Sequence, residues 1–101
     1  MARVFYTFFD ALNSGDVDLA MSVVADDAEI CFQTCKNTPE SIHQMLQIML
    51  NNSYRHEVVI SRIEGDTIYF QHIVYYSKAL LLRGEDIMVI QDGKIKKLRG
   101  L

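Results

Sequence analysis

The chain has 101 residues, which is the usual size of one domain and too short for two domains with separate cores. Half of its residues are hydrophobic and 23% are charged, so we expect a folded protein and not a disordered one. The net charge of −3 disfavours nucleic acid and anionic membranes as partners. We therefore interpret residues 1–101 as a single domain.

The N-terminal segment and the two cysteines bear on the cellular compartment. No apolar run approaches the roughly 18 residues that span a bilayer, and Asp10 and Asn13 interrupt the first apolar stretch before a signal-peptide core could form. These features predict a cytoplasmic protein. Cys31 and Cys35 are too few for a disulfide framework and, without further ligands, for a metal site. We expect two free thiols, no metal and no cofactor.

The N-terminal residues predict two helices followed by a strand. A helix from Ala2 to Leu12 would carry apolar residues at steps of three and four, namely Val4, Phe5, Phe8, Phe9 and Leu12. Gly15 suits the left-handed position just past a helix, and Asp16 caps the second helix. The apolar face of this second helix consists of Val17, Ala20, Met21 and Val24. From Ala28 to Gln33 the apolar period changes to two, which predicts a strand.

The rest of the chain predicts one helix and then an antiparallel meander. Thr38 is expected to cap a helix that begins at Pro39 and continues to about Leu50. Its inner stripe would consist of Ile42, Met45, Leu46, Met49 and Leu50. Strands are expected at about 54–64, 67–76, 81–91 and 94–101, with turns at Gly65-Asp66 and Asp92-Gly93. Helices followed by a meander define an α+β domain.

The predicted strands carry apolar residues on both faces, and this bears on assembly. Along 67–76, for example, Phe70 and Val74 point one way while Tyr69 and Ile73 point the other. Because the helices can cover only one face, the outer face is expected to be buried in a two-fold homodimer. The alternative is a sheet with scattered exposed apolar residues, which is common in monomers.

Two stretches resemble the sequence patterns of a known superfamily. DALNSGDVDLAMSVVADDAEI, from Asp10 to Ile30, is similar to an opening of the form ALNxGDxDxxxxxFADDA. GEDIMVIQDGKIKKLRG, from Gly84 to Gly100, is similar to a closing hairpin. These patterns are typical of the nuclear transport factor 2-like superfamily, which the chain therefore resembles and which includes SnoaL-like polyketide cyclases and ketosteroid isomerases. The resemblance implies a cone-shaped fold, in which three N-terminal helices pack on the concave face of a curved, mainly antiparallel sheet and leave a pocket between them.

The resemblance also permits a comparison with the ketosteroid isomerase residues. That enzyme uses a carboxylate base, together with a tyrosine and a protonated aspartic acid that donate hydrogen bonds to the developing oxyanion. The matching positions in this chain are Phe32 for the base, Phe8 for the tyrosine and Asp86 for the acid. A phenyl ring can neither take a proton nor stabilise an oxyanion. We therefore expect no steroid isomerase activity.

His72 and Asp86 are the candidate catalytic residues. A meander register that pairs His72 with Asp86 and Phe70 with Met88 places them on the sheet face that lines the pocket. A carboxylate that fixes the tautomer of an imidazole prepares a general base. The expected pocket-lining residues are Phe8, Phe32, Met45, Met49, Phe70, Tyr76 and Met88. The alternatives are a purely structural His–Asp pair, or a slipped register that separates the two residues. His43 and His56 are expected to face solvent.

These expectations lead to two functional hypotheses. In the first, the domain binds a small apolar molecule between helices and sheet, with isomerase, cyclase or hydrolase chemistry at His72 and Asp86. In the second, the methionine and phenylalanine residues fill the cone, and the domain is a ligand-free dimerisation or scaffold module. An open cavity favours the first hypothesis, and a filled cone favours the second.

Overall fold

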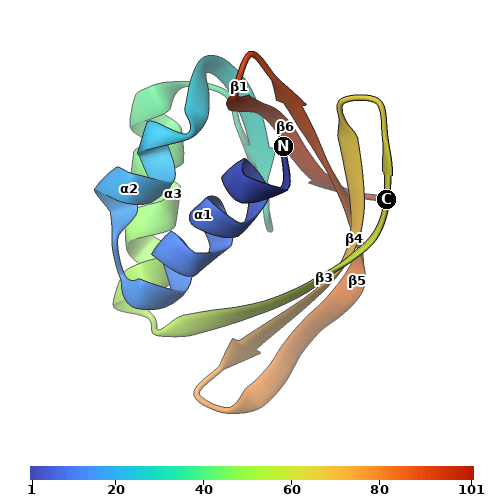
Figure 1. Cartoon of the computed structure of the whole chain (residues 1–101). Coiled ribbons are helices and arrows are strands. Elements are labelled where there is room, and N and C mark those ends of the chain that lie inside the picture. The colour runs from blue at the N-terminus through green and yellow to red at the C-terminus, as the bar shows by residue number, and fades with distance from the viewer.

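The computed structural model describes all residues from Met1 to Leu101. Three helices lie together on one side of a single curved sheet (Figure 1). The helices are α1 (Ala2–Ser14), α2 (Val17–Ser22) and α3 (Pro39–Asn51). The strands are β1 (Val24–Cys31), β2 (Cys35–Lys36), β3 (Tyr54–Glu64), β4 (Thr67–Tyr76), β5 (Ala79–Gln91) and β6 (Lys94–Gly100). The predicted α+β class is confirmed.

The sheet has the strand order β2-β1-β6-β5-β4-β3. Strands β3 to β6 form the predicted antiparallel meander, and β1 joins it by pairing in parallel with β6. Since the meander reaches β1 only through its last strand, β3 is left as an edge strand at the opposite end of the sheet. No helix in the structure is long and apolar enough to cross a membrane.

Gly15, Asp16 and Thr38 cap helices as the sequence predicts. Gly15 adopts the left-handed conformation with φ 81° and closes α1. The backbone N–H of Leu19 donates to Asp16 Oδ1 at 3.0 Å and caps α2. At the start of α3 the backbone N–H of Ser41 donates to Thr38 Oγ1 at 3.2 Å. The hydroxyl of Ser41 also accepts the backbone N–H of Thr38, which completes a capping box.

The first strand and the cysteines correct two expectations. β1 begins at Val24, which was expected in the second helix, and ends at Cys31, so Phe32 lies beyond it. The chain then turns back into the short strand β2, which the sequence pattern did not predict. This antiparallel pairing makes Cys31 and Cys35 direct partners, and their sulfurs form a disulfide. The prediction of two free thiols is therefore wrong, because spacing along the chain did not reveal the hairpin that joins them.

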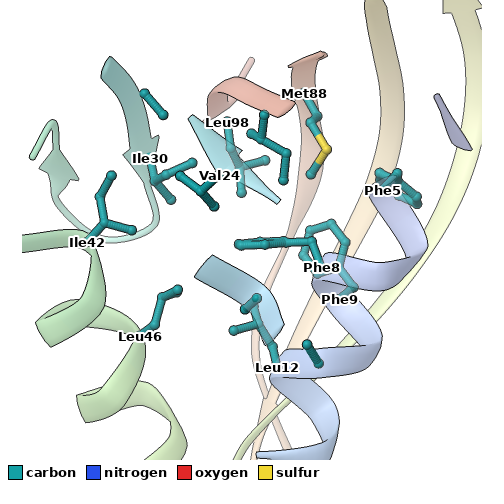
Figure 2. Packing of buried hydrophobic residues seen from close by; sticks show 14 of the residues in the cluster. Phe5, Phe8, Phe9, Leu12, Val24, Ile30, Ile42, Leu46, Met88 and Leu98 are labelled. Atoms are coloured by element: carbon teal, nitrogen blue, oxygen red, sulfur yellow. The ribbon is translucent and has the colours of Figure 1, made fainter. Parts of the chain in front are cut away.

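The core lies between α1 and the centre of the sheet. Phe5, Phe8 and Phe9 of α1 are at most 1% exposed, and Figure 2 shows them meeting side chains from α3, β1, β5 and β6 in one cluster. Phe5 also packs edge-to-face on Phe70 of β4, with 4.9 Å between the ring centroids. Burial of each such ring contributes about 1.5–3 kcal/mol. The aromatic face of α1 therefore fills the middle of the cone.

The register between β4 and β5 differs by two residues from the predicted one. His72 lies opposite Gly84, and Phe70 lies opposite Asp86. The expected register was wrong because the connection is a two-residue turn, Ser77-Lys78, in which both residues have positive φ. A bulge then leaves Leu81 without a partner. A shift of two residues keeps every side chain on its face of the sheet, so Asp86 still shares the inner face with Phe70.

Candidate functional site

An open cavity of about 470 Å³ lies between α3, the β1–β2 connection and the ends of β3, β4 and β5. Apolar side chains supply much of its wall: Phe32, Met45, Ile48, Met49, Tyr54, Val74, Leu81 and Leu82. Polar side chains complete it: Gln33, Thr34, Lys36, Ser41, Gln44 and His56. The cone is therefore filled at α1 and open under α3.

Three of the predicted pocket residues line this cavity, namely Phe32, Met45 and Met49. Four do not. Phe8, Phe70 and Met88 are fully buried in the core, because the phenylalanines of α1 pack directly on the sheet and leave no space there. Tyr76 is 46% exposed near the end of β4, where its ring packs against that of Tyr54. The predicted pocket included the space between α1 and the sheet, which is filled, whereas the cavity lies under α3.

A hydrogen-bonded chain of three side chains crosses β3, β4 and β5 next to the cavity. His72 Nδ1 lies 2.8 Å from Asp86 Oδ2, and His72 Nε2 lies 2.9 Å from His56 Nδ1. Both histidines are 3% exposed, and the Asp86 side chain is 17% exposed. The expected contact between His72 and Asp86 thus forms diagonally across the strands and not between direct partners. Their catalytic role stays a prediction.

His56 is the member of this chain that sequence reasoning missed. It was expected to face solvent, and the structure shows it buried on β3, in the wall of the cavity. The signal was present in the strand pattern, because His56 shares its face with Val58 and Ile60 at a period of two. His72, by contrast, is not part of the cavity wall. The prediction for His43 is confirmed, since its side chain is 48% exposed.

Asn13 holds the backbone of His56 in place. Its side-chain amide donates to the His56 carbonyl at 2.8 Å, and its Oδ1 accepts the His56 backbone N–H at 2.7 Å. Because β3 is an edge strand, these two backbone groups have no neighbouring strand to pair with on that side. The last turn of α1 therefore fixes the position of a cavity residue on β3.

The surroundings of His56 are apolar. The rings of Phe9 and Phe32 lie 5.8 Å and 5.7 Å from it, centroid to centroid. Burial, and secondarily the charge of His72, lower the pKa of His56 from 6.5 to about 3. His56 is therefore a neutral imidazole at neutral pH.

No group of three or more His, Cys, Asp or Glu side chains is arranged to hold a metal ion.

This architecture defines the class of protein. Three N-terminal helices on a curved six-stranded sheet form the nuclear transport factor 2-like fold. A family model described as the SnoaL-like domain matches residues 5–98. The chain therefore belongs to the SnoaL-like family. No functionally curated protein matches it by sequence.

Solved structures share the fold at low sequence identity. A protein from Sinorhizobium meliloti, assigned as a polyketide cyclase, is 21% identical with a TM-score of 0.81, and the match covers 95% of this chain and 91% of that one. An epoxide hydrolase of the LEH-like type from M. tuberculosis is 19% identical with a TM-score of 0.74, covering 96% and 74%. A computationally designed 17-OHP binder is 13% identical with a TM-score of 0.85, covering 99% and 88%. Similarity at this level shows the fold alone.

Proposed function

We propose that this SnoaL-like protein binds a small, largely apolar molecule in the cavity under α3 and carries out isomerase-, cyclase- or hydrolase-type acid–base chemistry on it. The observation that carries the proposal is the apolar cavity of about 470 Å³ with the His56–His72–Asp86 chain at its wall. Ligand sites in proteins typically measure about 300–1,000 Å³ and combine apolar walls with a few polar groups. A ligand-free scaffold would not need such a cavity.

The distribution of apolar and polar side chains in the cavity wall suggests which parts of the ligand are apolar and which are polar. Met45, Met49 and Leu82 offer apolar surface, whereas Lys36 and Gln44 are polar. Lys36 forms no ion pair within the chain, so its ammonium group is free to meet an anionic or polar end of a ligand. A molecule with an apolar body and one polar end therefore suits the cavity.

A cavity-blocking substitution tests ligand binding. Gln44→Trp would place an indole at the cavity, and Gln47→Trp on the same helix, outside the cavity wall, is the matched control. The probe is 1-anilinonaphthalene-8-sulfonate, which has an apolar body and an anionic end. We expect Gln44→Trp to weaken probe binding about tenfold, or about 1.4 kcal/mol, and the control to bind as the unmodified protein does. Equal affinities for the two variants would exclude the cavity as the site.

Native mass spectrometry separates the two functional hypotheses. A small molecule that co-purifies with the unmodified chain and is lost from Gln44→Trp supports a ligand-binding protein. If no molecule co-purifies and the probe does not bind, the scaffold module is the better description.

We also propose that the outer sheet face forms a two-fold homodimer. On that face Val59 is 66% exposed, and Tyr69, Ile73 and Tyr75 are only partly buried within the single chain. Covering such apolar surface is the usual reason for a two-fold contact. Light scattering should give twice the chain mass. Ile73→Asp should reduce the mass to that of one chain, while Gln47→Asp on α3 should not. A monomeric unmodified protein would refute the proposal.

A further inference from the structure

The chain of hydrogen bonds from Asp86 ends on His56, a residue of the cavity wall. His56 Nδ1 and both ring nitrogens of His72 are occupied by the two hydrogen bonds described above. His56 Nε2 makes no hydrogen bond within the protein. Every fully buried side-chain nitrogen or oxygen atom in the structure has a hydrogen-bond partner. Because Nε2 has none, it is not fully buried and keeps some contact with solvent. Because His56 lines the cavity, we infer that this nitrogen is reached from the cavity.

The carboxylate at the other end determines which ring nitrogens carry protons. Ionised Asp86 can only accept, so His72 Nδ1 carries a proton and donates it to Asp86 Oδ2. In a neutral His72 the lone pair is then on Nε2, where it accepts the N–H of His56 Nδ1. A neutral His56 with its proton on Nδ1 has its own lone pair on Nε2. When both rings are neutral, the chain therefore has an unprotonated imidazole nitrogen on His56, in the cavity wall.

We propose that His56 is the residue that exchanges a proton with the bound molecule, and that His72 and Asp86 are positioning residues that keep the resulting charge away from the cavity. This inference rests on the proposed function. A proton leaving the bound molecule forms a bond to His56 Nε2, while the proton on His56 Nδ1 moves to His72 Nε2. His56 is then neutral again, with an acidic N–H facing the cavity, and His72 is an imidazolium beside Asp86. The reverse transfer returns a proton to the molecule.

The surroundings of the two rings explain why the charge would move. Burial lowers the pKa of His56 to about 3, so an imidazolium at His56 is strongly disfavoured. On His72 the same charge lies 2.8 Å from a carboxylate oxygen. The other titratable side chains in the cavity wall are Lys36 and Tyr54, and neither is hydrogen-bonded to the two rings. The histidine pair can therefore act as a base and then as an acid while His56 stays neutral.

Nitrogen-15 NMR of the histidine rings tests the proton arrangement without any ligand. At a pH where both rings are neutral, we expect their protons on Nδ1 and their Nε2 atoms unprotonated. When the pair takes up one proton at lower pH, His72 should become imidazolium and the His56 proton should switch from Nδ1 to Nε2. Asp86→Asn keeps an oxygen for His72 but removes the charge, so the imidazolium should be absent at the pH where the unmodified protein shows it. A His56 proton that stays on one nitrogen throughout the titration would overturn the inference.

A reactive probe tests proton transfer itself. The small apolar molecule 5-nitrobenzisoxazole opens when a base removes its C3 proton: the C–H electrons form the nitrile, the N–O bond breaks, and a coloured phenolate results. General bases typically contribute about 100-fold or more to rate, so His56→Gln should slow the opening by about 100-fold. The exposed control His43→Gln should open the probe at the unmodified rate. Equal rates for His56→Gln and the unmodified protein, in the presence of the expected NMR signature, would overturn the proton-transfer role. Failure of the unmodified protein to bind 1-anilinonaphthalene-8-sulfonate would instead count against the proposed function.

Discussion

The buried His56 predicts that the protein loses stability in mild acid. Its pKa is 6.5 when solvated and about 3 in the folded protein. Between these values the unfolded chain binds a proton that the folded chain does not, so the free energy of unfolding falls as the pH falls below 6.5. At about 1.4 kcal/mol per pH unit, the loss between pH 7 and pH 5 is about 2 kcal/mol. This is a large share of the roughly 5–15 kcal/mol typical of a domain.

Urea unfolding followed by circular dichroism measures this loss, since the chain contains no tryptophan for fluorescence. His56→Gln removes the titrating ring and keeps a hydrogen-bonding side chain next to His72. We expect its free energy of unfolding to change about 2 kcal/mol less than that of the unmodified protein between pH 7 and pH 5. His43→Gln, on the exposed face of α3, should lose as much stability between pH 7 and pH 5 as the unmodified protein does. The reasoning would be refuted by equal losses in the unmodified protein and His56→Gln.

Three further predictions concern Asn13, the disulfide and steroid isomerisation. Asn13→Ala should lower the free energy of unfolding by about 1–3 kcal/mol, since two hydrogen bonds to His56 are lost at about 0.5–1.5 kcal/mol each. Urea unfolding measures this loss, and an alanine variant as stable as the unmodified protein would argue against the paired contact. Alkylation before reduction should label neither cysteine, and labelling of both thiols would contradict the disulfide. The Cys31→Ser, Cys35→Ser double variant should have a free energy of unfolding about 2 kcal/mol lower, because the disulfide closes a short loop. No isomerisation of a 3-oxo-Δ5-steroid should be detected by absorbance, because Phe8 and Phe32 cannot supply the oxyanion donor and the base; a rate that disappeared in Asp86→Asn would contradict this.

Local signals in the sequence were sufficient for most of the fold. Gly15, Asp16 and Thr38 end or begin helices through their own backbone preferences and hydrogen bonds, which depend on a few neighbouring residues. The bounds of β3 and β4 also match the expected ranges, because period-two alternation and the Gly65-Asp66 turn mark them. These features needed no knowledge of distant contacts.

The site depended more strongly on tertiary contacts. The His72–Asp86 contact was predicted through a register that proved wrong by two residues, and it survived because an even shift preserves the face. The face of His56 could have been predicted from its alternation with Val58 and Ile60. Its contact with His72 could not, because it depends on how the edge strand pairs with β4.

The sequence by itself determined the class of the protein: an α+β domain of the SnoaL-like family with an apolar interior and a His–Asp pair on the inner sheet face. Only the tertiary structure decided which part of that interior is open. The phenylalanines of α1 fill the cone against the sheet, and the space that remains lies under α3, where His56 and not His72 forms the wall. The physical reason is that periodicity fixes the face on which a side chain lies, whereas volume depends on how side chains from distant elements pack together.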